Sequence, residues 1–169
     1  MLWYPVGGGT RHYGFSMANL KDKTLEEVAA WLPRMFEEYV ADRVKAGEDA
    51  ASAQKNADAQ HAELFPGGQP APQQFVMNVL VDEEVVGTLW MGRPLNASSD
   101  TWFVFDLEIE KGFRGRGFGR EAMEEAEEWT REHGGTRVGL NVFGPNLAAR
   151  SLYDSLGYEV LATAMFKDL

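Results

Sequence analysis

Residues 106–119 constrain the fold of this chain more than any other segment. An apolar, β-favouring run passes through a loop of glycines and arginines directly into an amphipathic helical pattern. Glycine lets a backbone approach phosphate closely, and the free N–H groups of a helix start attract anions. This order predicts an anion-binding cradle, to which Arg114, Arg116 and Arg120 add positive charge. The alternative is a solvated turn in front of a helix.

Two common nucleotide-binding loops do not match this segment. A Walker A loop needs Gly, four residues and then Gly-Lys-Ser/Thr, and neither Gly112 nor Gly115 begins such a run. A dinucleotide-binding fingerprint needs a glycine three residues after Gly117, where Arg120 stands instead. Both of these readings are therefore excluded.

The periodicity of the rest of the chain predicts helices that alternate with strands. Helices are expected over residues 24–45, 49–65, 117–133 and 146–155, and strands over 75–81, 85–91, 101–109 and 137–143. Residues 158–166 are expected as a terminal strand or strand pair. Thr24 and Glu27 resemble a capping box, and Pro33 marks a kink or a break in the first helix.

This pattern predicts an α/β fold with a mixed sheet covered by helices. We expect a single domain over residues 1–169. Residues 1–16 are expected to be flexible, or to be an addition to the native chain.

Composition and charge exclude several functional classes. The net charge of −10 has the wrong sign for binding a nucleic-acid backbone. It would attract a cationic amine, or it serves solubility alone, as in many acidic proteins. The absence of cysteine excludes disulfides, thiolate zinc sites and a cysteine nucleophile. The three histidines are widely spaced, so no metal site is expected. With no apolar run of the roughly 20 residues that a bilayer requires, and no secretion signal, we expect a cytoplasmic protein without a membrane partner.

Two segments carry a more specific signal. Arg114, Gly117 and Gly119 fit the pattern Arg or Gln, two residues, Gly, one residue, Gly or Ala. Residues 140–158 then run from an apolar strand through Asn146, Ala149, a Leu-Tyr pair and a Gly-Tyr pair. In this order the two segments resemble the GNAT superfamily of acetyl-CoA-dependent N-acetyltransferases. The resemblance implies a mainly antiparallel mixed sheet whose two central strands, 101–109 and 137–143, splay to admit acetyl-CoA.

The resemblance also implies a cofactor site. The pantetheine arm would pair with the strand around Leu107 and Ile109, and Asn146 with Ala149 would hold it from the other side. Asn146 could instead be an ordinary helix N-cap, a position that asparagine favours without any ligand. The pyrophosphate of acetyl-CoA would bind the backbone of Arg114, Gly115, Arg116, Gly117, Phe118 and Gly119.

Acetyl transfer to an amine needs a neutral nucleophile, stabilisation of the carbonyl oxygen and a proton for the departing thiolate. The resemblance implies that Tyr153 is the general acid, and a phenol is still protonated at neutral pH and can donate to a thiolate; the alternative is a core tyrosine. Asp106 and Glu108 share one face of a strand and could draw the amine or a water toward the thioester, or be simple surface polarity. The strand glutamate that serves some members as base is replaced by Phe103, so the base is not assigned.

The predicted function is transfer of an acetyl group from acetyl-CoA to a primary amine, by direct attack in a ternary complex. The acceptor would be a small molecule or a protein. The alternative is a catalytically inactive coenzyme A-binding sensor, and a further one is a structural or antitoxin-like partner protein. The terminal strands could mediate a homodimer, although no sequence feature requires one.

Overall fold

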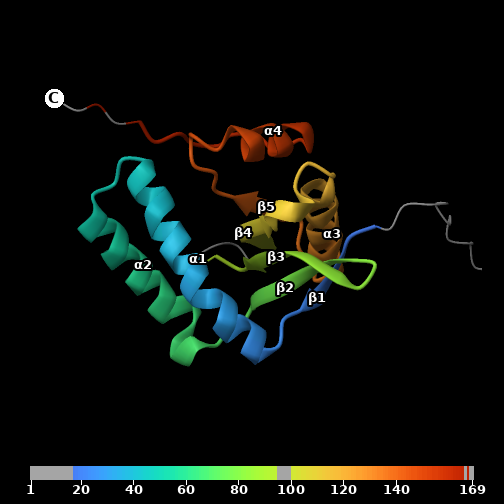
Figure 1. The fold of residues 1–169 in the computed structure, drawn as a ribbon. Helices are drawn as coiled ribbons and strands as arrows, with labels where there is room; N and C mark the ends of the chain where they lie inside the picture. Colours follow the sequence, from blue (N-terminus) through green and yellow to red (C-terminus); the bar gives the residue numbers. More distant parts are fainter. Residues whose placement is uncertain (1–16, 95–99, 166, 168–169) are drawn as a thin grey trace, which may run out of the picture.

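The computed structural model describes residues 17–94, 100–165 and 167, so the expectation for residues 1–16 lies outside the described residues. The elements alternate between helices and strands much as the periodicity predicts (Figure 1). In chain order they are β1 Asn19–Asp22, α1 Leu25–Lys45, α2 Ala50–Leu64, β2 Gln74–Val81, β3 Glu84–Gly92, β4 Thr101–Ile109, α3 Phe118–Glu132, β5 Arg137–Leu140 and α4 Leu147–Ser155. Short 3-10 helices occupy Pro66–Gly68 (η1) and Lys111–Phe113 (η2).

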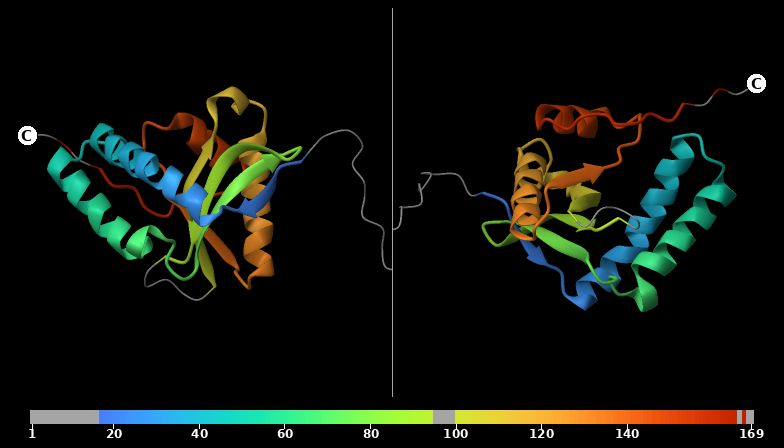
Figure 2. Two further views of the ribbon diagram at one scale, coloured as in Figure 1. Left: turned by 60° about the horizontal axis from the view of Figure 1, so that its bottom comes forward. Right: turned by 180° about the vertical axis from the view of Figure 1, so that it is seen from behind.

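A five-stranded sheet forms the middle layer, in the order β1-β2-β3-β4-β5. Strands β1 to β4 pair antiparallel with one another, and β5 runs parallel to β4. Helices α1 and α2 lie on one side of the sheet and α3 lies on the other (Figures 1 and 2). The mixed, mainly antiparallel α/β fold expected from the sequence is therefore confirmed.

Each face of the sheet buries its own core, because successive side chains of a strand point to opposite faces. On the α3 side, Met77 and Val79 pack with Ala122 and Met123. On the α1 side, Val76 and Trp90 belong with residues of α1 and with Phe65 to a second buried cluster. The sheet is thus held between two apolar layers. No helix in the described part of the chain is long and apolar enough to cross a membrane.

Helix α1 begins where the sequence predicts. The Thr24 side chain accepts a hydrogen bond from the Glu27 backbone N–H at 3.2 Å, and the Glu27 carboxylate accepts one from the Thr24 N–H at 2.7 Å. These two bonds satisfy donors that a helix start leaves unpaired. Pro33 lies inside the helix without dividing it.

A β-bulge interrupts β4 next to the predicted catalytic residues. Trp90 of β3 pairs with Asp106, but the next residue, Met91, pairs with Val104. Phe105 is therefore an extra residue with no partner on β3. Its ring stacks on Trp90 with ring centroids 4.6 Å apart.

The bulge reverses the side-chain alternation along β4. Before it, Trp102 and Val104 are buried in the core on the α3 side. After it, the odd-numbered residues Leu107 and Ile109 pack against that core. Asp106 and Glu108 consequently point away from α3, toward the side of α1.

The structure corrects three details of the sequence prediction. The described part of the terminal segment, residues 158–165, forms no strand. Without that strand, β5 lies at the edge of the described sheet rather than in its centre, and it ends at Leu140 instead of residue 143. The sequence analysis also missed β1, which has only four residues with a polar pattern that hides its pairing with β2. Hydrogen bonds to β2, rather than its own apolar pattern, make β1 a strand.

Replacing Gly87 with alanine tests the close approach of β3 to β4. An added Cβ would lie 2.3 Å from the Glu108 carbonyl oxygen and 3.2 Å from the Ile109 Cα, so one strand would have to move. We expect Gly87→Ala to lower the free energy of unfolding by about 1–3 kcal/mol, as overpacking commonly does. Gly112→Ala is the matched control, because nothing lies within 4 Å of its Cβ position. Urea unfolding measures both, and equal stabilities would contradict the close approach.

Candidate active site

The loop before α3 has the geometry of an anion cradle. Gly115 and Gly117 adopt φ values of +74° and +94°, which side-chain-bearing residues rarely tolerate. Gly117 is the N-cap of α3, and no side chain caps the helix start. The first N–H groups of an α-helix have no partner inside the helix, so this end presents free donors and a positive dipole. An anion with several oxygens fits such a site.

Three arginines surround this loop in different ways. The Arg116 guanidinium lies over the rings of Phe113 and Phe118, at 5.8 and 5.0 Å from their centroids. The Arg114 Nε donates a hydrogen bond of 2.7 Å to the Ile109 carbonyl oxygen, which ties the loop to the end of β4. Arg120 donates to the Ser155 hydroxyl of α4. The three arginine side chains thus place positive charge beside the glycine loop.

The carboxyl-terminal half of β4 borders the loop. Pairing between β4 and β5 ends at Val104 with Leu140, so beyond Val104 no described strand pairs with this edge of β4. Leu107 and Ile109 pack their side chains into the α3-side core. An extended ligand could therefore pair with the backbone edge of β4 near Leu107, next to the cradle.

Helix α4 joins this region through its carboxyl-terminal half. A Cβ on Gly119 would be only 3.5 Å from Leu152 of α4 and 3.7 Å from Ile109 of β4, so three elements meet there. At the other end of α4, the Asn146 Oδ1 accepts a hydrogen bond of 3.1 Å from the Ala149 N–H. Asn146 is thus the N-cap of α4, and a cofactor role for Asn146 and Ala149 stays a prediction.

Tyr153 of α4 is half-buried at the rim of the α3-side core. Its ring centroid lies 5.7 Å from that of Tyr158. Burial, and secondarily the negative charge of Asp106, raise the pKa of the Tyr153 hydroxyl above its usual value. The phenol is therefore protonated at neutral pH and close enough to Asp106 for the two groups to interact electrostatically.

Asp106 is a partly buried carboxylate, and no hydrogen bond or ion pair from another described residue holds it. Burial raises its pKa from 3.8 to about 7, with further contributions from the negative charges of Glu108 and Glu38, and the positive charge of Arg34 opposes this effect. A carboxyl group with a pKa near neutrality can accept and release a proton under physiological conditions.

Glu108, two residues along the same strand, has a different environment. Arg34 of α1 donates to both of its carboxylate oxygens, with distances of 3.1 Å to Oε1 and 2.8 Å to Oε2. Arg114 Nη2 lies 3.6 Å from Oε1. The bond to Glu108 raises the pKa of Arg34. Glu108 therefore connects α1, β4 and the cradle loop through paired charges.

The sequence profile of the acetyltransferase (GNAT) family matches residues 28–158, which include the cradle, β4 and α4. The chain belongs to the GNAT acetyltransferase family. The family resemblance of the two sequence segments is thereby confirmed.

Individual relatives of this GNAT protein agree with that assignment. The uncharacterised N-acetyltransferase YycN of Bacillus subtilis (strain 168) is 28% identical over 149 residues, which cover 85% of this chain and 94% of YycN. YdgE of the same organism, also named an uncharacterised N-acetyltransferase, is 27% identical over 153 residues, with 89% and 97% covered.

Solved structures show the same fold. The crystal structure of YycN from Bacillus subtilis matches with a TM-score of 0.82 at 26% identity and covers 90% of this chain and 98% of its own. The aminoglycoside N-acetyltransferase AAC(6')-Iy in complex with CoA matches with a TM-score of 0.56 at 13% identity, covering 94% and 98%. This second likeness concerns the fold alone.

Within the GNAT chain, the position of the family's strand glutamate holds a partly buried phenylalanine. The rings of Phe103 and Phe105 lie 5.0 Å apart, so an apolar surface occupies this place. The sequence analysis did not find Arg34, Glu38 or Asp42, whose charges act on Asp106. Their four-residue spacing places them on one side of α1, but nothing in the sequence says which strand that side meets.

No metal centre is formed by the described residues, because no three His, Asp or Glu side chains lie close enough together to hold an ion. The groups that the structure brings together are the cradle loop, the end of β4, Asp106 and Tyr153. The assignment of roles to individual residues remains a prediction.

The protonation of Asp106 can be tested through stability. A carboxyl whose pKa is higher in the folded than in the unfolded protein makes the folded state less stable as the pH rises from about 4 to about 7. The wild type should therefore lose at least about 1 kcal/mol relative to Asp106→Asn between pH 4.5 and pH 8, because one pKa unit is worth about 1.4 kcal/mol. Urea unfolding at both pH values measures this, and a constant difference would contradict the raised pKa.

Proposed function

We propose that this GNAT protein transfers an acetyl group from acetyl-CoA to a primary amine by direct attack in a ternary complex. One observation carries the proposal. The start of α3 lies in a glycine loop without a side-chain cap, and Asp106 of β4 and Tyr153 of α4, which interact electrostatically, belong to the elements that border this loop. The CoA bound by the structural relative AAC(6')-Iy supports the same cofactor class.

The residues of the cradle fit the cofactor. The free N–H groups at the start of α3 and the guanidinium of Arg116 would bind the pyrophosphate, and the β4 edge near Leu107 and Ile109 would pair with the pantetheine arm. Acetyl-CoA, when bound, supplies the acetyl group as a thioester. A backbone N–H of the β4 edge would stabilise the carbonyl oxygen as it gains negative charge.

Asp106 is our candidate for the base. A substrate amine is protonated at neutral pH and must lose a proton before its nitrogen can form the new C–N bond. Asp106 can take that proton, directly or through a water, because its pKa lies near 7. Glu108 is less suited, since Arg34 and Arg114 already neutralise it. We assign Glu108 the role of holding α1 against the cradle.

Tyr153 is our candidate for the acid. When the C–S bond breaks, the sulfur leaves with the electron pair and needs a proton. The raised pKa of the Tyr153 hydroxyl keeps that proton available at neutral pH. Asp106 has no cationic partner of its own among the described residues, so its negative charge would attract a cationic acceptor. We take this acceptor to be a primary amine, of a small molecule or a protein.

Binding of acetyl-CoA, measured by calorimetry, tests the cofactor site. Arg116→Glu should weaken binding at least about tenfold, because a charge-assisted contact with phosphate is replaced by repulsion. Arg131→Glu is the matched control, since Arg131 lies at the opposite end of α3, and its affinity should stay within about twofold. Absence of binding by the folded wild type would refute the proposal.

Catalysis can be followed by the release of a thiol without interference from protein thiols. The chain contains no cysteine, so the thiol detected is coenzyme A. In a screen of primary amines, Tyr153→Phe should lower kcat by about 10²-fold or more while acetyl-CoA affinity stays unchanged. For the wild type, kcat should rise with pH up to an apparent pKa of about 7, and Asp106→Asn should lose this dependence. Tight acetyl-CoA binding without transfer to any amine would favour the sensor alternative instead.

A further inference from the structure

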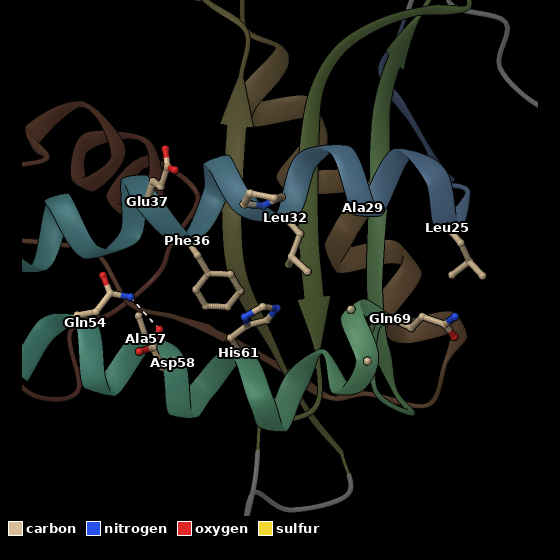
Figure 3. Close-up of a pocket in the computed structure, with 13 residues that line it drawn as sticks. Leu25, Ala29, Leu32, Phe36, Glu37, Gln54, Ala57, Asp58, His61 and Gln69 are labelled. Carbon is tan, nitrogen blue, oxygen red and sulfur yellow. Dashed lines mark hydrogen bonds between the residues drawn. The ribbon is translucent and has the colours of Figure 1, made fainter.

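A groove lies between α1 and α2 (Figure 3), whereas α3, whose start forms the cradle, lies on the other side of the sheet (Figures 1 and 2). The groove has a volume of about 540 Å³ and reaches from the middle of the two helices to η1. This is within the usual range of small-molecule sites, about 300–1,000 Å³.

Small side chains leave this space open. Ala29 and Pro33 of α1 and Ala57 of α2 line it, so the side chains of the two helices fill the gap between them only in part. In the middle of the groove, the rings of Phe36 and His61 face each other with centroids 4.7 Å apart (Figure 3). Phe36 is half-buried and His61 is exposed, so another ring can pack against the outer part of this pair.

The two ends of the groove differ in polarity. Leu25, Ala29 and Leu32 make one end apolar, and Leu25 is 58% exposed although it is a large hydrophobic residue. At the other end, Asp58 accepts a hydrogen bond of 2.8 Å from the Gln54 side chain (Figure 3). The rings of Phe36 and His61 lie next to this carboxylate in Figure 3, and an aromatic surface beside a carboxylate is complementary to an amphiphilic cation.

The charges near the polar end are negative. Among the described residues, Asp58 forms no ion pair, and no lysine or arginine lines the groove. Glu37 of α1 belongs to the same end and adds negative charge, although its side chain turns outward in Figure 3. Asp58 is exposed, so its carboxylate is accessible to a cation from solution.

We propose that this groove binds a small organic cation in which an aromatic ring carries an alkylammonium group. The ring would pack against Phe36, His61 and Pro33, and the cationic nitrogen would lie next to Asp58. A free small molecule fits better than a second copy of the chain, because a protein with net charge −10 is repelled by an acidic groove. This inference does not depend on the acetyltransferase proposal.

Calorimetry with trimethyl(2-phenylethyl)ammonium tests the site. This probe has the required ring and charge but no N–H, so it cannot be an acetyl acceptor. We expect a Kd on the order of 0.1–1 mM, which is realistic for a ligand of this size. The anion 3-phenylpropanoate has a similar shape and should bind at least about tenfold more weakly. Equal binding of the two probes would overturn the charge argument.

Two matched pairs of variants locate the binding site. Ala29→Trp should fill the groove and weaken probe binding at least about tenfold, whereas Ala30→Trp, on the adjacent exposed position of α1, should leave it within about twofold. Asp58→Asn should weaken binding about two- to fivefold, in line with an exposed ion pair. Asp154→Asn on α4 removes the same charge elsewhere and should have no effect.

The remaining outcomes separate this groove from the acceptor site. Asp106→Asn should retain full probe binding, and loss of binding there would place the probe at the acceptor site and overturn the proposal. In sedimentation experiments, we expect the groove to play no part in self-association of the wild type. If the wild type self-associates and Ala29→Trp abolishes this, a second copy of the chain is the occupant of the groove, and the small-molecule proposal is wrong.

Discussion

The extra residue in β4 is the constraint on which the candidate site depends. Because Phe105 has no partner on β3, the strand changes which face its side chains occupy at this point. After the bulge, the side chains of Leu107 and Ile109 pack into the α3-side core, while those of Asp106 and Glu108 point toward α1. Without the bulge, the even-numbered residues would continue toward α3, and Asp106 would be buried among apolar side chains. The stacking of Phe105 on Trp90 anchors the bulge in the core on the α1 side.

The two carboxylates of β4 differ from each other because the residues around them differ. Glu108 is held by Arg34 and lies near Arg114, so its negative charge is compensated and it links α1 to the cradle loop. Asp106 has no such partner among the described residues, and burial together with nearby negative charges keeps its pKa near 7. The different environments of the pair separate a structural carboxylate from a candidate base. Tyr153 of α4, whose pKa is raised in the same region, is the candidate for the complementary acid.

Helix α1 contributes residues to both the candidate active site and the groove toward α2. One stripe of it, including Ala29, Leu32 and Phe36, lines the groove toward α2. Another, Arg34, Glu38 and Asp42, surrounds Asp106 with charge. The helical period makes this possible, because residues four apart lie on the same side. Residues of α1 thus contribute to both the candidate acceptor environment and this groove.

The sequence by itself determined the features that depend on neighbouring residues. The capping box at Thr24, the helix periodicity and the glycine loop before α3 all have local causes, and so they were predictable, as were the family and the α/β class. Contacts between distant segments decided the rest. Strand β1 exists because it pairs with β2, residues 158–165 form no strand despite their composition, and the bulge depends on the register with β3. The clamp from Arg34 to Glu108 joins residues 74 positions apart, and the pKa of Asp106 follows from burial. Such properties arise only when folding brings charges and apolar surfaces from separate elements together, which no local pattern encodes.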